Sequence, residues 1–339
     1  MDFTPPDPWP APDSRRGPSP RHDSAACEPP AASCHALART ALSCFLRHPR
    51  RRKPAVMTFL ISTARLEAML REDAPYGDLT TQALDIGDTR GQAVLRAGAT
   101  MMLCCAEEAE ALFRLAGCTD AHRVAASGGL LEEGGTILTA EGPVSGLYLA
   151  ARAAQALMET ASGVASRAAR IRSEARSARP DIVVACTRRH LPGIKDVMLK
   201  AIMTAGCIPN RLGLSDSLLV SAQHRAFLGR EPAHRWVSRV RAVQPARRLV
   251  VEAFSVDEAV LLAHAGVDTV QCDGLSPEQF AEVSRALADH GSRPVLAAAG
   301  DIHEGNAAAY ARAGADVLVT SAPFAAAPLD VKVTMDRLG

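Results

Sequence analysis

Four apolar segments recur at nearly regular intervals in the C-terminal half of the chain, and this rhythm restricts the fold more than any other feature. The segments cover residues 248–253, 268–272, 294–298 and 316–320, and each gap between them carries a helical pattern. Strands that are apolar on both faces and alternate with helices are typical of a parallel sheet covered by helices. The pattern predicts an α/β domain, and a barrel of βα units fits it better than an open sheet.

Two of the helices between these strands have recognisable starts. Ser255 followed by Glu258, and Ser276 followed by Gln279, are capping boxes, and Pro277 occupies the first helical position of the second helix. No GxGxxG motif follows any strand and no Walker loop is present. These absences count against a Rossmann dinucleotide site and a P-loop nucleotide site.

The composition describes a globular protein with no nucleic-acid or membrane partner. Of the 339 residues 47% are hydrophobic and only 4% aromatic, so Ala, Val and Leu must build the core. The 38 basic and 37 acidic residues nearly cancel, which gives no electrostatic case for nucleic acid or an anionic membrane. The nine cysteines show no CxxC pair or zinc spacing, and no secretory signal is visible. We therefore expect reduced thiols and a cytoplasmic location.

The first 56 residues differ from all that follow. They hold 11 of the 22 prolines and the basic run at 50–53, a composition that cannot bury enough apolar surface to offset its ordering entropy. We expect residues 1–56 to form a disordered Pro/Arg-rich extension. The alternative hypothesis is that translation starts at Met57, where a new globular pattern begins.

Mixed α/β patterning begins at residue 57 and continues to about residue 161. A long Ala/Arg-rich helical stretch covers residues 149–177, and Ser162-Gly163 predicts an interruption in it. The other expected elements are helices at 62–72 and 106–117, a loop at 73–81, and strands at 91–104, 122–127, 136–148 and 182–186.

Charged and small residues stand where the predicted strands end, which is where βα barrels carry their chemistry. Adjacent guanidiniums can each donate a bidentate pair of hydrogen bonds to carboxylate or phosphate oxygens. A Glu and an Asp on neighbouring strands can accept hydrogen bonds from ribose hydroxyls or hold Mg²⁺ through water. Small-residue loops after the last two strands commonly bind a phosphate. Strand by strand, the residues are Arg188 and Arg189, Glu252, Asp273, Ala299 and Gly300, and Ser321.

Each of these residues also has a structural explanation when it is taken singly. An arginine pair after a strand is often a surface salt-bridge partner, and a lone carboxylate often caps a helix. Asn210 and Arg211 either add donors to the site or hold a structural loop. The coincidence of several such residues at one edge favours a site for a phosphorylated sugar beside an anionic second substrate.

Four motifs resemble those of the quinolinate phosphoribosyltransferase (nicotinate-nucleotide pyrophosphorylase) family. They lie at residues 73–81 (DAPYGDLTT), 152–163, 187–193 (TRRHLPG) and 210–216 (NRLGLSD). Their order and spacing match the family from about residue 65 to the C-terminus.

Within that family the chain looks most like the ModD branch, the pyrophosphorylases encoded with molybdate transport genes. The features that carry this likeness are Pro209, Gln271-Cys-Asp273, Ala297-Ala-Ala-Gly300, Thr320-Ser-Ala-Pro323 and Pro328-Leu-Asp-Val-Lys332.

The resemblance implies the fold of the type II phosphoribosyltransferases. An N-terminal α/β sandwich domain at 57–161 would pack on a C-terminal α/β (TIM-like) barrel at 162–323, and residues 324–339 would return to the first domain. It also implies a homodimer in which one subunit's sandwich domain closes the neighbour's barrel mouth. The family reaction uses phosphoribosyl pyrophosphate, Mg²⁺ and a small aromatic acid, and converts quinolinate to nicotinate mononucleotide.

Carried over residue by residue, the resemblance assigns the acid substrate to four arginines. Arg152 would reach it across the dimer interface. Arg188, Arg189 and Arg211 would hold its carboxylates, with Arg189 standing where the family usually has lysine.

The resemblance assigns the phosphorylated sugar to a second group of residues. Glu252 and Asp273 would bind the ribose hydroxyls and organise Mg²⁺, while Ala299, Gly300 and Ser321 would face the 5′-phosphate. The expected catalytic residues are Arg188, Arg189, Glu252 and Asp273.

Three positions depart from the family pattern. Asn210 replaces the usual histidine, Ser221 replaces one lysine, and Leu199 occupies a second lysine position, so we expect the neighbouring Lys200 to bind substrate in its place. Fewer cations weaken the case for a dicarboxylate, because an unpaired carboxylate in a dry pocket is costly. The second hypothesis is a catalytically weak barrel protein that senses a small anion in molybdate metabolism. An aldolase or synthase is a third hypothesis, disfavoured because no strand carries an internal lysine.

Overall fold

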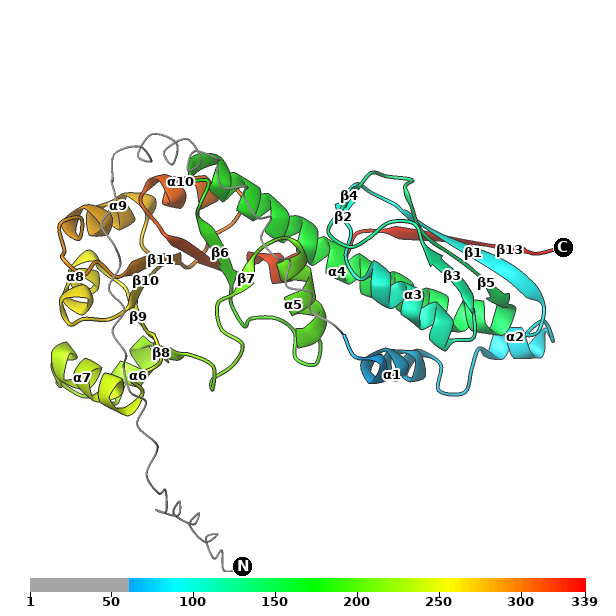
Figure 1. Ribbon diagram of the computed structural model, residues 1–339, viewed down its shortest axis with the longest axis horizontal. Helices are drawn as coiled ribbons and strands as arrows, with labels where there is room; N and C mark the ends of the chain where they lie inside the picture. Colours follow the sequence, from blue (N-terminus) through cyan, green and yellow to red (C-terminus); the bar gives the residue numbers. More distant parts are fainter. Residues whose placement is uncertain (1–60) are drawn as a thin grey trace, which may run out of the picture. The chain divides into compact units, whose positions relative to one another are not determined.

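The computed structural model describes residues 61–339 (Figure 1). The predicted extension at 1–56 lies outside the described residues, so its disorder stays a prediction. Within residues 61–339 no helix is long and apolar enough to cross a membrane.

The first sheet is antiparallel and joins strands from distant parts of the sequence. β1 (Arg90–Ala97) pairs with β5 (Thr136–Pro143) on one side and with the C-terminal strand β13 (Val331–Arg337) on the other. β3 (Asp120–Arg123) completes the order β13-β1-β5-β3. Helix α3 (Ala106–Leu115) packs against β3 and β5 of this sheet.

Short elements correct two expectations for this region. The predicted loop at 73–81 follows α1 (Thr63–Asp73) but runs into a short helix, α2 (Leu79–Ala83), because the Asp78 carboxylate accepts hydrogen bonds from the backbone N–H groups of its first turn. The predicted strand at 91–104 is divided, since β1 ends at Ala97. The second part is β2 (Met101–Met102), which pairs with β4 (Leu130–Leu131).

Helix α4 (Val144–Ala178) is 35 residues long and connects the antiparallel four-stranded sheet to a parallel sheet of seven strands. It packs against α3, α5 (Lys195–Thr204) and α10 (Ala307–Arg312) (Figure 1). The interruption predicted near Ser162 and Gly163 is absent, because both residues lie inside the continuous helix. Gly163 serves packing instead: a Cβ there would collide with the backbone carbonyl oxygen of Ala327, so only glycine lets that segment approach the helix.

The second sheet is parallel and has seven strands in the order β7-β6-β12-β11-β10-β9-β8. Its edge strands, β7 and β8, are two and three residues long and do not pair with each other within residues 61–339. The predicted α/β fold is therefore confirmed, with the parallel sheet as a half-barrel rather than a closed barrel. The strands are β6 (Val183–Cys186), β7 (Ile208–Pro209), β8 (Leu218–Val220), β9 (Leu249–Ala253), β10 (Thr269–Asp273), β11 (Val295–Ala299) and β12 (Val317–Thr320).

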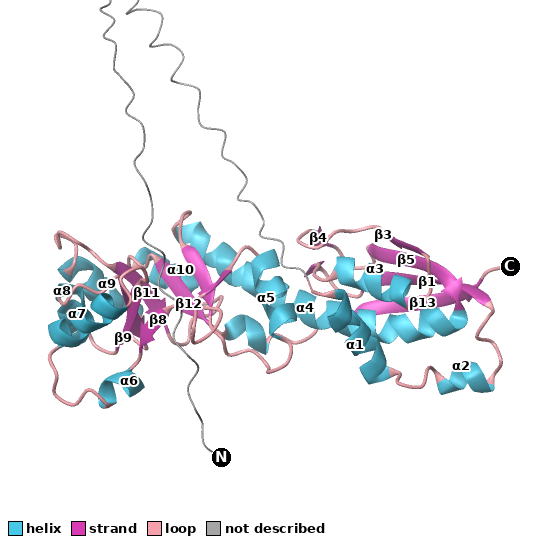
Figure 2. Ribbon diagram, turned by 60° about the horizontal axis from the view of Figure 1, so that its bottom comes forward, coloured by secondary structure: helices cyan, strands magenta, loops and turns pink. Residues whose placement is uncertain are grey.

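Helices alternate with these strands along the chain and lie beside them (Figure 2). The box of Ser276 and Gln279 forms as predicted, with both reciprocal hydrogen bonds. Ser255 caps its helix through the N–H of Glu258, whereas the Glu258 carboxylate accepts from the N–H of Phe254. The helices are α5 (Lys195–Thr204), α6 (Ala222–Ala226), α7 (Ala233–Val243), α8 (Val256–His264), α9 (Pro277–Ala286), α10 (Ala307–Arg312) and the 3₁₀ turn η1 (Ala322–Ala325).

The two faces of the half-barrel strands pack differently. One face belongs to the main hydrophobic core, as shown by Leu296, Ala298 and Leu318. The alternating residues of the other face form a separate small cluster, made of Ala185, Ala297, Ala299 and Val319. Because these inner side chains are small, the concave face of the half-barrel has room for a ligand.

Candidate active site

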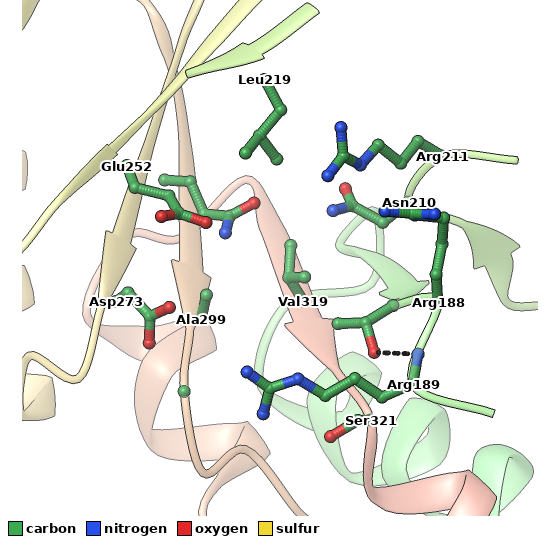
Figure 3. Close-up of a pocket in the computed structure, with 13 residues that line it drawn as sticks. Arg188, Arg189, Asn210, Arg211, Leu219, Glu252, Asp273, Ala299, Val319 and Ser321 are labelled. Atoms are coloured by element: carbon green, nitrogen blue, oxygen red, sulfur yellow. Dashed lines mark hydrogen bonds between the residues drawn. The ribbon is translucent and has the colours of Figure 1, made fainter. Parts of the chain in front are cut away.

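A cavity of about 390 Å³ opens at the carboxyl ends of the half-barrel strands (Figure 3). Nine of the eleven predicted site residues line it. They are Arg188, Arg189, Asn210, Arg211, Glu252, Asp273, Ala299, Gly300 and Ser321. The remaining lining residues are Thr187, Leu219, Gln271 and Val319.

One side of the cavity is cationic. Arg189 and Arg211 extend across it from the segments that follow β6 and β7 (Figure 3). Burial lowers the pKa of Arg211, and the like charge of Arg188 lowers it further. None of these three arginines forms a salt bridge with a carboxylate in residues 61–339. Neighbouring guanidiniums that form no salt bridge favour an anionic ligand.

The facing side carries two carboxylates, Glu252 from β9 and Asp273 from β10 (Figure 3). Burial raises the pKa of Glu252 above its usual value, and the nearby charge of Asp273 raises it further. Oxygen ligands of this kind suit hydroxyl groups or a hard divalent cation.

Gly300 keeps the loop after β11 close to the carboxylate side. Its φ is +114°, and a Cβ there would lie 3.0 Å from the backbone nitrogen of Gly274 and 3.3 Å from the Asp273 carboxylate. A larger residue would push this loop away, so glycine sets the width of the cavity at this point.

Two predicted residues lie elsewhere. Arg152, on α4, lines a separate groove with Met69 and Leu157 and donates a hydrogen bond to Gln155 at 3.2 Å. Its implied role in a neighbouring subunit's cavity stays a prediction.

Lys200 does not reach the cavity, which corrects the expectation that it binds substrate. It is 6% exposed on α5, and its Nζ lies 2.6 Å from Glu108 Oε1 and 3.3 Å from Glu107 Oε2. Burial alone would lower the pKa of Lys200, and the Glu108 carboxylate more than offsets that effect. The charge of Lys200 is therefore neutralised inside the fold.

The structure also explains one departure from the family pattern and adds one residue to the set that lines the cavity. Ser221, at a family lysine position, caps helix α6 in a capping box with His224. Gln271 lines the cavity and was not among the predicted site residues. A signal for it was present, because residues two apart in a strand share a face and Gln271 precedes Asp273 by two.

Comparison with known families covers most of the described chain. The model of the quinolinate phosphoribosyl transferase N-terminal domain matches residues 78–162, and that of the C-terminal domain matches residues 164–334. The ModD protein of Rhodobacter capsulatus, which bears the name of a pyrophosphorylase, is 41% identical over 256 residues, covering 76% of this chain and 98% of its own.

Two further proteins are similar to this chain and point to the same family and fold. A Methanothermobacter thermautotrophicus protein, named as a nicotinate-nucleotide pyrophosphorylase (carboxylating), is 30% identical over 278 residues, covering 80% of this chain and 98% of its own. The crystal structure of NadC from Streptococcus pyogenes matches with a TM-score of 0.74 at 24% identity, over 81% of this chain and 96% of that one; this likeness confirms the fold. The two family models together span both sheets and the cavity, and the chain belongs to the quinolinate phosphoribosyl transferase family.

Proposed function

We propose that this protein transfers a phosphoribosyl group from phosphoribosyl pyrophosphate to a ring nitrogen of a small heteroaromatic acid. The observation that carries the proposal is the opposition of two carboxylates and three arginines that form no salt bridge within residues 61–339, across one cavity. A site for a simple anion has no use for two carboxylates at its mouth, whereas a sugar with hydroxyl groups does. The names of the ModD and nicotinate-nucleotide pyrophosphorylase relatives support the same reaction class.

Each side of the cavity fits one part of the reactants. Glu252 and Asp273 would accept hydrogen bonds from the ribose hydroxyls, and the loops of Gly300 and Ser321 would hold the 5′-phosphate. The arginines would pair with the carboxylate of the acid and with the leaving pyrophosphate. The donor sugar would then lie between the carboxylate side and the cationic side.

The residues present also fit Mg²⁺. The proposed donor carries a pyrophosphate group, and the carboxylate pair Glu252 and Asp273 supplies hard oxygen ligands. Within residues 61–339 no cluster of three or more metal-ligating side chains occurs, so the remaining ligands would come from the donor and from water, as is usual for Mg²⁺. When bound, the ion would offset negative charge on the pyrophosphate.

The chain's own contribution to the reaction would be positioning and electrostatics. The ring nitrogen donates its electron pair to ribose C1, the bond from C1 to the pyrophosphate oxygen breaks, and pyrophosphate leaves with that electron pair. Arginines that fix the acid would hold its nitrogen in line with C1, and their charges would stabilise the departing anion. We further propose that the protein acts as a homodimer, with Arg152 completing the neighbouring cavity.

Pyrophosphate release tests the proposed function. We expect the full chain with Mg²⁺ and phosphoribosyl pyrophosphate to release pyrophosphate only when a pyridine carboxylic acid is added, with quinolinate, nicotinate and aminonicotinates as the panel. A coupled colorimetric assay measures the product, and omission of the acid is the control. Folded protein that releases none with any acid contradicts the proposal.

A further inference from the structure

Gln271 is an unusual residue for the inner face of a parallel sheet. It lies in the middle of β10, is only 5% exposed and lines the cavity. Its Oε1 atom is buried and has no hydrogen-bond partner within residues 61–339. Buried side-chain oxygens without a partner are rare, because their desolvation is not compensated.

The side chains around Gln271 do not supply the missing donor. In register beside it on the flanking strands stand Glu252 and Ala297, and Asp273 follows two residues later on the same face. The carboxylates accept hydrogen bonds when ionised and the alanine offers none. The other inner-face residues nearby, Ala299 and Val319, are apolar. Asn210 and the three arginines of the same cavity are donors, but none of them bonds to this oxygen within residues 61–339. The oxygen is therefore free to accept from a molecule bound in the cavity.

The neighbours of Gln271 indicate which reactant supplies the donor. Gln271 lies two residues before Asp273, which ends β10, and is in register with Glu252 on β9 and Ala297 on β11. The carboxylates of Glu252 and Asp273 already supply acceptors for the sugar's hydroxyl groups, so the sugar does not need a further acceptor. Towards β11 the inner face carries the small apolar side chains of Ala297 and Ala299, which leave room for a flat ring beside the Gln271 amide.

We infer that Gln271 determines acceptor specificity by accepting a hydrogen bond from an N–H or O–H group on the acceptor ring. This inference rests on the proposed phosphoribosyl transfer and names its substrate class: a heteroaromatic acid that carries an amino, amide or hydroxyl substituent besides its carboxylate. Ionised quinolinate and nicotinate have no such donor, so they would leave the Gln271 oxygen unpaired. A site built around a hydrogen bond discriminates strongly against an analogue that lacks it.

The test compares nicotinate with its 2-, 5- and 6-amino derivatives in the pyrophosphate-release assay. We expect the wild-type protein to prefer at least one amino derivative by tenfold or more in kcat/KM, on the order of one lost hydrogen bond to a buried group. The Gln271→Met variant keeps the length of the side chain and removes the amide. It should reduce that preference to within about twofold, and the KM for phosphoribosyl pyrophosphate should stay within about twofold of the wild-type value.

Two further measurements distinguish a specific role of the Gln271 amide from a general effect of losing an amide or of losing stability. Gln244→Met, which removes an exposed amide at the end of α7, should leave the preference intact. The melting temperature of ligand-free Gln271→Met should equal or exceed that of the wild type, because the variant buries no unpaired oxygen.

Four results would overturn the inference. Gln271→Met with an undiminished preference would do so, as would a variant whose main defect is a raised KM for the phosphoribosyl donor. Pyrophosphate release from nicotinate as fast as from every amino derivative would leave the proposed function standing and remove this inference alone. No release with any acid would remove both.

Discussion

The Glu252→Gln and Asp273→Asn variants should each lose phosphoribosyl transfer by about two to three orders of magnitude while remaining folded. The loss is expected because charged groups that are fixed in a desolvated cavity contribute most of the electrostatic stabilisation in such reactions. Each amide keeps the shape of the side chain and removes the charge that would bind ribose and Mg²⁺. Steady-state pyrophosphate release measures the effect.

Glu282→Gln is the matched control, since Glu282 is exposed on α9, and it should retain wild-type activity. Donor binding should also weaken as the pH falls towards the pKa of Glu252. Burial, and then the charge of Asp273, raise that pKa above its usual value, so protonation removes the carboxylate charge at a higher pH than an exposed glutamate would. Near-normal turnover in either amide variant would exclude these carboxylates from the reaction.

The Lys200→Met substitution should lower the free energy of unfolding by about 3–5 kcal/mol, the largest loss of stability that we expect from a single substitution. Lys200 Nζ bonds both oxygens of Glu108, whose side chain is 5% exposed. Removal of the lysine leaves that carboxylate buried without a counter-charge, and breaking a buried pair from one side is far more costly than replacing both partners. Urea unfolding followed by circular dichroism measures the change.

The double variant Lys200→Met/Glu108→Leu separates charge from packing. It should recover most of the lost stability, because an apolar pair replaces the ion pair. Glu107 belongs to the same cluster. Burial would raise its pKa, but hydrogen bonds from Ser127 and the charge of Lys200 lower it to about 2. Its stabilising contribution is thus present above the ordinary glutamate pKa and is lost as the pH falls towards 2. A double variant no more stable than Lys200→Met would refute this account.

Much of the fold and site follows from the sequence because regular patterns encode them. The spacing of apolar segments predicts the strands β9 to β12, and parallel strands bring their carboxyl ends to one edge. Glu252, Asp273, Gly300 and Ser321 are found there because each stands at or just after a strand end. A linear pattern of this kind needs no knowledge of long-range contacts.

Features that depend on distant contacts are the ones sequence reasoning missed. Gly163 suggests a helix break, yet it permits close packing of Ala327, which lies 164 positions along the chain. Lys200 stands next to an expected lysine position, but one residue rotates a side chain by about 100° around a helix, and it meets Glu108 instead. The length of α4 and the half-barrel's open edges likewise depend on packing.

Calorimetric titration of the full chain with phosphoribosyl pyrophosphate tests the central claim most directly, because the cavity is proposed to hold that donor. We expect saturable binding to one site per chain in the presence of Mg²⁺. The affinity should fall at least tenfold in the double variant Glu252→Gln/Asp273→Asn, as expected when charge-assisted hydrogen bonds are lost. Absence of binding by folded protein, or equal binding by the double variant, would contradict the account.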